Sequence, residues 1–219
     1  EQRNALDAAH YEALSEAWIR VRDDDAIRVA VVTGAGDRVF SAGADLKSWI
    51  GRETPLSDLW LTQKGQLLNR GLEIWKPVIA ALNGHCLAGG MTLMLATDVR
   101  VCAEHVTFAL SEVKRGIIAA NGGTQRLLGQ LPHAIAMEML LTGDAIDAAA
   151  AARFGLVNKV VPAAWASPAF RAAKPLSSTT TRGALSSARP PCMKATSSPS
   201  TAAPARSMRV KYQRSKRPS

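Results

Sequence analysis

Two short turns made of small residues could present backbone N–H groups to a substrate. They are Phe40-Ser41-Ala42-Gly43-Ala44-Asp45-Leu46 and Leu87-Ala88-Gly89-Gly90. Each turn follows an apolar run typical of a buried strand and precedes a helical pattern, so free N–H groups are expected there. Two such groups that converge on one point form an oxyanion hole, which stabilises negative charge on a carbonyl oxygen. Either turn alone more often indicates close packing between a helix and a strand, which also needs small residues.

One carboxylate further along the chain is placed for proton transfer. Glu112 interrupts the apolar stretch Phe108-Ala109-Leu110-Ser111-Glu112-Val113. Apolar surroundings raise the pKa of a carboxyl group toward the range that is useful for general acid–base catalysis. The simpler alternative is a surface glutamate on a helix or loop, and the spacing alone favours that alternative.

Alternating strands and helices are expected to position these residues. The predicted strands cover 27–33, 77–82, 99–103 and 156–161, and the predicted helices cover 6–22, 67–75, 91–96, 125–131, 134–141 and 145–154. The strands are short apolar runs that end at turn residues, and the first helix has apolar residues at helical spacing. Strands that alternate with helices indicate parallel crossover connections, so the predicted fold class is α/β.

The composition is typical of a globular domain with an appendage. The chain has 219 residues, 47% of them hydrophobic, which is enough for a sizeable core. No apolar run approaches the roughly 20 residues that a membrane span requires, so no membrane association is expected. The chain begins Glu-Gln-Arg-Asn with no apolar leader, which favours a cytoplasmic protein. The three cysteines form no C-x-x-C pair and the four histidines are scattered, so neither a metal site nor a disulfide framework is expected.

The net charge of +9 comes from one end of the chain. Residues 163–219 hold 11 of the 27 Lys and Arg residues and no Asp or Glu, so residues 1–162 carry 16 basic against 18 acidic residues. The same segment contains 7 Pro and 11 Ser without a sustained apolar period. Such a segment buries too little surface to offset the entropy of ordering, so we predict a disordered tail.

The order of the motifs over residues 1–162 resembles the crotonase superfamily, the enoyl-CoA hydratase/isomerase family. The matching segments are residues 1–6 (EQRNAL), 40–46 (FSAGADL), 83–84 (NG), 88–90 (AGG), Asp98, Phe108 with Glu112, 122–127 (GGTQRL), 136–144 (AMEMLLTGD) and 154–162 (FGLVNKVVP). The resemblance implies a crotonase-like fold of repeated β-β-α units over residues 1–162, with a first strand missing upstream.

The resemblance also implies roles for the two turns. The carbonyl oxygen of an acyl-CoA thioester would lie between the N–H groups of Ala44 and Gly89. The loop that contains Ala42, Asp45 and Leu46 would hold the CoA part of the substrate. No metal or redox cofactor is implied, because CoA arrives with the substrate. Intact relatives are expected to assemble as homotrimers or hexamers.

One position departs from the pattern of typical hydratases in this family. They use two glutamates to activate water, one matching Glu112 and one at the position of Thr92. A threonine hydroxyl can hold a water molecule but cannot accept a proton near neutral pH. A hydratase or dehydratase that uses Glu112 alone as acid and base, with Thr92 placing the water, is the first expectation. A 3-enoyl to 2-enoyl-CoA isomerase and a non-catalytic acyl-CoA-binding protein are the alternatives.

The segment 163–219 does not resemble the helices with which the family normally ends. Its abrupt, acid-free composition resembles out-of-frame translation of a GC-rich coding sequence, a hypothesis that sequencing of the locus near codon 163 would test. Its 11 basic residues would allow unspecific nucleic-acid binding. Because aromatic residues are not interleaved with them and no nucleic-acid module is present, nucleic acid is not the expected partner.

Overall fold

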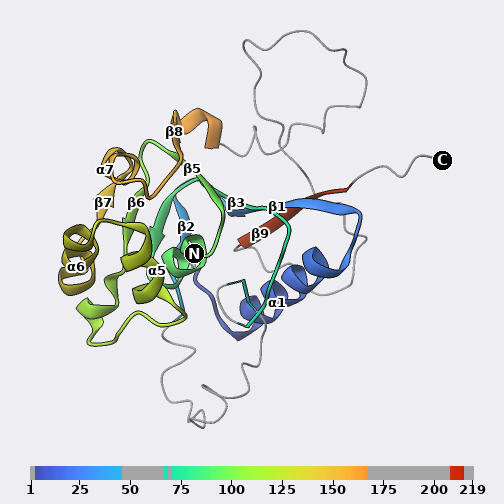
Figure 1. The fold of residues 1–219 in the computed structure, drawn as a ribbon, viewed down its shortest axis with the longest axis horizontal. Helices are drawn as coiled ribbons and strands as arrows, with labels where there is room; N and C mark the ends of the chain where they lie inside the picture. The colour runs from blue at the N-terminus through green and yellow to red at the C-terminus, as the bar shows by residue number, and fades with distance from the viewer. Residues whose placement is uncertain (1–2, 46–66, 69–70, 167–207, 215–219) are drawn as a thin grey trace.

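Two β-sheets organise the part of the chain that the computed structural model describes, residues 3–45, 67–68, 71–166 and 208–214 (Figure 1). The larger sheet has the order β8-β5-β3-β1-β9 and the smaller has the order β2-β4-β6-β7. The strands of the larger sheet are β1 (Ile27–Gly34), β3 (Val78–Leu82), β5 (Val99–Ala103), β8 (Lys159–Val161) and β9 (Met208–Arg214). Those of the smaller sheet are β2 (Val39–Ser41), β4 (His85–Leu87), β6 (Thr107–Ala109) and β7 (Ile146–Asp147).

From β1 to β6, consecutive strands alternate between the two sheets. β3 lies in the larger sheet, β4 in the smaller sheet, and helix α4 (Gly89–Leu95) follows. The same order returns in β5 and β6, which are followed by the 3₁₀ turn η1 (Ser111–Arg115) and helix α5 (Gly123–Gln130). The α/β class and the repeated β-β-α units predicted from the sequence are therefore confirmed.

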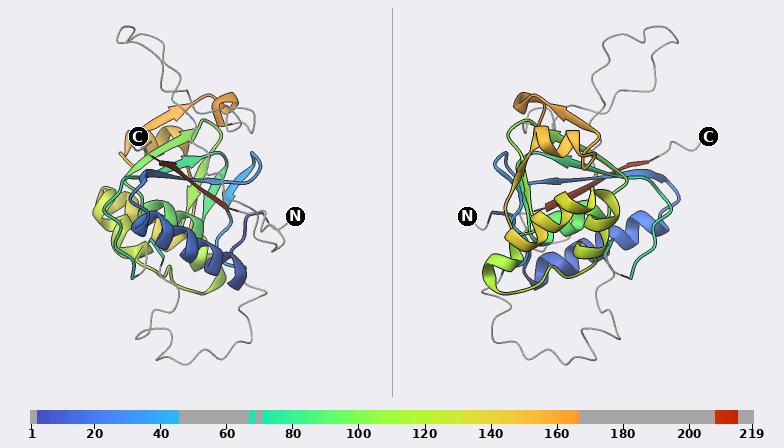
Figure 2. Two further views of the ribbon diagram at one scale, coloured as in Figure 1. Left: turned by 90° about the vertical axis from the view of Figure 1, so that its right-hand side faces the viewer. Right: turned by 60° about the vertical axis from the view of Figure 1, so that its left-hand side comes forward.

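The larger sheet is parallel from β8 to β1. Val31 is level with Ile79, and Ala81 is level with Val101. The strands are made of the apolar runs that predicted them, and alternate side chains of β3 are buried. Helices α1 (Ala8–Asp23), α4 and α5 lie on one side of this sheet (Figure 2). Asp7 caps α1 by accepting a hydrogen bond from the His10 N–H, and Leu14, Trp18 and Val21 are buried beneath it.

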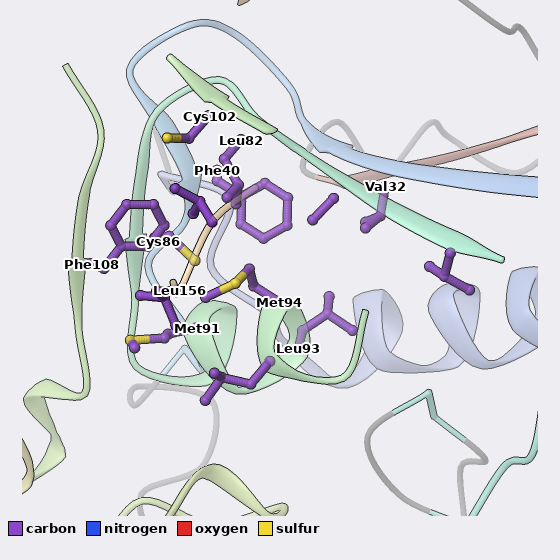
Figure 3. Close-up of a cluster of buried hydrophobic side chains, with 14 of the residues drawn as sticks. Val32, Phe40, Leu82, Cys86, Met91, Leu93, Met94, Cys102, Phe108 and Leu156 are labelled. Carbon is purple, nitrogen blue, oxygen red and sulfur yellow. The ribbon is translucent and has the colours of Figure 1, made fainter. Parts of the chain in front are cut away.

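The core lies between the sheets and helix α4. Met91 and Met94 of this helix are fully buried and belong to one cluster with Phe40, Leu82 and Cys86 (Figure 3). Unbranched methionine side chains suit such a junction of two sheets and a helix, because they fill irregular space. Burial of both faces of α4 fixes the helix that begins at Gly89.

Three α-helices and a second short 3₁₀ turn follow η1. They are α5, α6 (His133–Thr142) and α7 (Ala148–Arg153), and η2 (Ala163–Ala166) follows β8. The predicted helices over 91–96, 125–131, 134–141 and 145–154 are confirmed with shifted ends. The largest shift arises because Ile146 and Asp147 pair with β6 before α7 begins.

Two predictions differ from the structure. The helix predicted over residues 67–75 is wrong, because Leu67 and Gly71 form an isolated bridge and residues 72–75 are not helical. The disorder predicted for residues 163–219 is wrong for Met208–Arg214, which form β9 and pair antiparallel with β1. The physical reason is that the edge of β1 offers unpaired N–H and C=O groups, and the sequence MRVKYQR alternates apolar and polar residues.

Candidate active site

The carboxyl ends of three neighbouring parallel strands bring the predicted site residues together. β2 pairs with β4 and β4 pairs with β6, all in parallel. Ala44 lies three residues beyond β2, Gly89 two residues beyond β4, and Glu112 three residues beyond β6. Parallel strands end at the same edge of a sheet, where α/β proteins generally bind their ligands. The small sheet therefore places the two turns and the carboxylate at one edge.

The N–H groups of Ala44 and Gly89 are neighbours. A Cβ atom added to Gly89 would lie 3.4 Å from the Ala44 nitrogen. On either side of Ala44, the Gly43 oxygen accepts from the Leu6 N–H at 2.8 Å and the Asp45 N–H donates to the Leu6 oxygen at 3.0 Å. The Ala44 N–H therefore faces away from Leu6. Within the described ranges neither the Ala44 nor the Gly89 N–H has a hydrogen-bond acceptor.

Glycines allow the two turns to approach each other this closely. A Cβ atom on Gly43 would lie 2.7 Å from the Gly89 nitrogen, and one on Gly90 would lie 2.7 Å from the Ser41 Cβ. Ala88, just before α4, has a φ of +48°. A non-glycine residue there is strained, and such strain is concentrated at functional sites. α4 spans seven residues, so the individual N–H groups, rather than a long helix dipole, provide the positive potential.

Thr92 lies on the first turn of α4 and is buried, with 2% of its surface exposed. Its hydroxyl lies 3.4 Å from the Ala88 oxygen, a long hydrogen bond. A Cβ atom on Gly123, at the start of α5, would lie 3.0 Å from the Thr92 Oγ1 atom. The hydroxyl therefore lies between the start of α4 and the start of α5.

Glu112 is half-buried on η1, and one oxygen of its carboxylate lacks a partner among the described residues. The Oε2 atom is buried and has no hydrogen-bond partner among the described residues. Burial raises the pKa of the Glu112 carboxyl above its ordinary value, and a hydrogen bond from its own backbone N–H opposes part of that rise. A shift in this direction favours proton transfer by a carboxyl group.

The raised pKa of Glu112 predicts how the stability depends on pH. The folded protein holds this proton more tightly than the unfolded chain, so Glu112 reduces stability as pH rises from its ordinary pKa through its folded value. The Glu112→Gln variant should be more stable than the wild type at pH 8, and this advantage should disappear near pH 4. Urea midpoints at both pH values measure the effect, and an advantage that is the same at both would contradict it.

The loop predicted to hold CoA is partly described. The Ala42 N–H donates to the Arg3 oxygen at 3.2 Å, so this loop is joined to the start of the chain. Asp45 is half-buried beside Ala44. Leu46 lies outside the described residues. These contacts place Ala42 and Asp45 at the same edge of the small sheet as Ala44.

Two buried polar side chains support the site and were not predicted from the sequence. The Ser41 Oγ atom donates to the Asn4 oxygen at 2.9 Å and accepts from the Gly43 N–H at 3.1 Å. The Asn83 side chain accepts from the Gly34 N–H and donates to the Gly36 oxygen. The feature of the sequence that could have indicated these two residues is their position beside a turn, where polar side chains often bond to backbone groups.

Neighbouring groups of potential chemical interest have structural partners. The His85 Nδ1 atom lies 2.9 Å from the Thr107 hydroxyl, a contact between β4 and β6. Burial raises the pKa of the Cys86 thiol well above its ordinary value, which makes this residue a poor nucleophile.

A surface hollow of about 640 Å³ is lined by residues that include Arg22, Trp75 and Arg126. None of the predicted site residues that the structure describes lies in its lining.

The described residues contain neither a cluster of metal ligands nor a helix that could span a membrane. No three or more His, Cys, Asp or Glu side chains in the described ranges are grouped as metal ligands. The helices of those ranges are too short or too polar to cross a membrane.

Comparison with known proteins agrees with this arrangement. The model of the family "Enoyl-CoA hydratase/isomerase" matches residues 1–197. The chain is 43% identical over 161 residues to (E)-benzylidenesuccinyl-CoA hydratase of Thauera aromatica, which covers 74% of this chain and 62% of the relative. It is also 43% identical over 160 residues to carnitinyl-CoA dehydratase of Proteus mirabilis, covering 73% of this chain and 61% of the relative.

Solved structures show the same fold. A carnitinyl-CoA dehydratase from Mycobacterium avium has a TM-score of 0.65 and 43% identity, covering 75% of this chain and 64% of the other. An enoyl-CoA hydratase from Mycobacterium tuberculosis has a TM-score of 0.67 and 39% identity, covering 75% and 63%. The chain thus spans a little over three fifths of the length of these relatives. With the matching family model, these similarities show that the chain belongs to the enoyl-CoA hydratase/isomerase family, within the crotonase superfamily.

Proposed function

We propose that this chain is an enoyl-CoA hydratase or dehydratase that uses one glutamate. The observation that carries this proposal is the close approach of the Ala44 and Gly89 N–H groups, which have no acceptor among the described residues. They follow β2 and β4, at the edge of the small sheet where β6 leads to the half-buried Glu112. Relatives at 43% identity are named hydratase and dehydratase, which supports the same reaction class here.

In the proposed reaction the thioester oxygen of a 2-enoyl-CoA accepts hydrogen bonds from the Ala44 and Gly89 N–H groups. The oxygen of water bonds to C3, and the electrons of the C2=C3 bond move toward the thioester oxygen. The Glu112 carboxylate takes a proton from the water and returns it to C2, so one water is added and the enzyme is unchanged. The two N–H groups stabilise the enolate charge, which is the kind of interaction that lowers the barrier most.

Thr92 would place the water and not exchange its proton. Its hydroxyl has only a long hydrogen bond to the Ala88 oxygen, which supports a further partner at the site. The Thr92→Val variant keeps the shape of the side chain and removes the hydroxyl. We expect hydration of crotonyl-CoA to slow by roughly tenfold, within the few kcal/mol that an unmade hydrogen bond to a buried group costs. Unchanged hydration would contradict a role for Thr92 in placing the water.

Isomerisation is the second candidate, and the observation that favours it is the absence of a carboxylate at position 92. Glu112 alone would take a proton from C2 of a 3-enoyl-CoA and return it to C4, through a dienolate whose oxygen is held by the same two N–H groups. The Thr92→Val variant separates the two, because isomerisation uses no water. A non-catalytic acyl-CoA-binding protein would bind the thioester and turn over neither substrate.

The proposed function is tested by the absorbance of the conjugated enoyl thioester. Loss of this absorbance with crotonyl-CoA indicates hydration, and gain of it with 3-hexenoyl-CoA indicates isomerisation. Binding without either change would overturn the enzyme and favour the binding protein.

We also propose, on the family resemblance, that the loop with Ala42, Asp45 and Leu46 holds the CoA part of the substrate. No separate cofactor enters this proposal. Assembly as a homotrimer or hexamer and a cytoplasmic location stay predictions.

A further inference from the structure

A buried guanidinium group holds the end of α4 that is opposite the candidate site. Arg100 of β5 is 9% exposed. Its Nη2 atom donates to the oxygens of Leu95 at 3.2 Å and Thr97 at 3.0 Å, and its Nε atom donates to the Met94 oxygen at 3.2 Å. Its Nη1 atom donates to the Leu156 oxygen at 3.1 Å. One side chain therefore binds three carbonyl groups in and just beyond the last turn of α4.

Arg100 is itself held firmly. Its N–H donates to the Asn158 Oδ1 atom at 2.8 Å, and its carbonyl oxygen accepts from the Asn158 N–H at 2.9 Å. Among the described residues no carboxylate forms an ion pair with the guanidinium, whose hydrogen-bond partners are neutral carbonyl groups. Burial of a charge without a direct counter-ion is costly, and burial lowers the pKa of Arg100. This cost calls for a compensating role.

The role of Arg100 is inferred from the N-terminal end of α4, where Gly89 lies. The last carbonyl groups of a helix have no partner within it, and the first N–H groups are usually covered by a capping side chain. α4 has no side-chain cap at Ala88. A cap would compete with a substrate for the same N–H groups. The helix can instead be fixed from its C-terminal end, which leaves the Gly89 N–H free.

A displacement of the C-terminal end of α4 would be transmitted to the candidate site. α4 has seven residues, so its two ends are about 10 Å apart. At the N-terminal end, a Cβ atom on Gly90 would lie 2.7 Å from Ser41, so little free space is left there. A second side chain, Gln130 of α5, donates to the Leu95 oxygen at 2.9 Å. A displacement at Leu95 is thus passed along a short, tightly packed helix to Gly89.

We propose that Arg100 is a positioning residue, which fixes α4 so that the Gly89 N–H stays aligned with the Ala44 N–H for the thioester oxygen. Arg100 would touch no substrate atom and would act through the helix. This inference rests on the proposed function for its catalytic consequence, although the geometry of α4 that it describes can be measured without turnover.

The test uses Arg100→Met, Arg100→Lys and a matched control, Lys76→Met. The Lys76 Nζ atom donates to the carbonyl oxygens of Val21 at 2.8 Å and Asp24 at 2.8 Å, so it holds the end of α1, away from the candidate site. Melting curves establish which variants are folded. The lysine variant keeps a charge with fewer donors, so it provides a folded variant if burial of methionine is not tolerated.

Two measurements are made on each folded variant, in addition to kcat and KM. The first is the red shift in absorbance of bound 4-(dimethylamino)cinnamoyl-CoA, which reports hydrogen bonding to the thioester oxygen. The second is the amide resonance and hydrogen exchange of Gly89 in ¹⁵N-labelled full-length protein. For Arg100→Met we expect most of the red shift to be lost, a faster exchange across α4, and a fall in kcat of about 10- to 100-fold with a smaller change in KM. Arg100→Lys should lie between it and the wild type.

The outcomes separate the two proposals. A red shift and a Gly89 resonance that are unchanged in the Arg100 variants, or changed equally in Lys76→Met, would overturn the positioning role. A wild type that binds the probe without a red shift would overturn the oxyanion hole. In that case the Gly89 resonance and exchange in Arg100→Met against Lys76→Met would still decide whether Arg100 fixes α4.

Discussion

Replacement of Glu112 by glutamine is expected to lower kcat for crotonyl-CoA by about 10²- to 10⁴-fold, the usual contribution of a positioned general acid or base. Glutamine keeps the size of the side chain and cannot exchange a proton. The carboxylate it replaces is half-buried, has a raised pKa and has no hydrogen-bond partner at Oε2 in the described structure. The measurement is initial-rate kinetics together with the Kd for crotonyl-CoA, because affinity should change little.

A matched control for this variant is Glu138→Gln. Glu138 lies on α6 and its side chain is exposed, so loss of its charge should leave kcat unchanged. Full turnover in Glu112→Gln would remove Glu112 from the mechanism. A loss of both affinity and turnover in a less stable Glu112→Gln protein would indicate a structural role. The expected gain in stability of this variant at pH 8 helps to separate these cases, since a structural residue should destabilise when replaced.

Four strands of the large sheet, β1, β3, β5 and β8, could be predicted from the sequence, whereas β9 and the small sheet could not. β1, β3 and β5 are apolar runs of five or more residues bounded by turn residues, which is enough to indicate a buried strand. β2, β4 and β6 have three residues each, too few to show a period. β4 includes His85, follows Asn83-Gly84 and overlaps the predicted turn at Leu87, so its residues do not indicate a strand. Pairing with β2 and β6, which lie far away in the chain, is what makes it a strand.

Candidate site residues could be named from the sequence because turns of small residues and a lone carboxyl group can be recognised without knowing the strands that position them. The residues themselves indicate two turns of small residues and one carboxyl group, Glu112, in an apolar stretch, and the family resemblance assigns the N–H donors to Ala44 and Gly89. Their common edge could not be derived, because it depends on three strands of three residues. Arg100 gave no signal, because one arginine in an apolar strand shows neither its burial nor the carbonyl groups it binds.

Several features of the candidate site lower the stability of the folded protein and leave polar groups available to a substrate. Among the described residues, the buried Glu112 Oε2 atom and the Ala44 and Gly89 N–H groups have no hydrogen-bond partner, and Ala88 has a positive φ. Each of these features is unfavourable for folding. They occur at one edge of a sheet whose surroundings are well packed. Such a concentration is expected of a functional site, where activity and stability make opposite demands on the same residues.

The second large effect is expected from Gly43→Ala, because a single methyl group would separate the two N–H donors. The added Cβ would lie 2.7 Å from the Gly89 nitrogen and 2.9 Å from the Ala88 Cβ. Contacts this short force the two turns apart, and Ala44 moves with Gly43. Misplacement of one oxyanion-hole donor costs about 10²- to 10³-fold in kcat. The φ of +88° at Gly43 adds backbone strain, so the stability should also fall, by about 1–3 kcal/mol.

Gly155→Ala separates the steric effect from the backbone strain. Gly155 has a φ of +80°, close to that of Gly43, and a Cβ atom added there meets nothing within 4 Å. It follows α7, away from the candidate site, so the variant should lose about 1–2 kcal/mol of stability and retain its turnover. If both variants lose stability and only Gly43→Ala loses kcat and the red shift of the bound probe, the close approach of the turns is required for catalysis. If Gly43→Ala keeps both, the thioester oxygen is stabilised elsewhere, because no arrangement of the two turns accommodates that methyl group without moving Ala44 or Gly89.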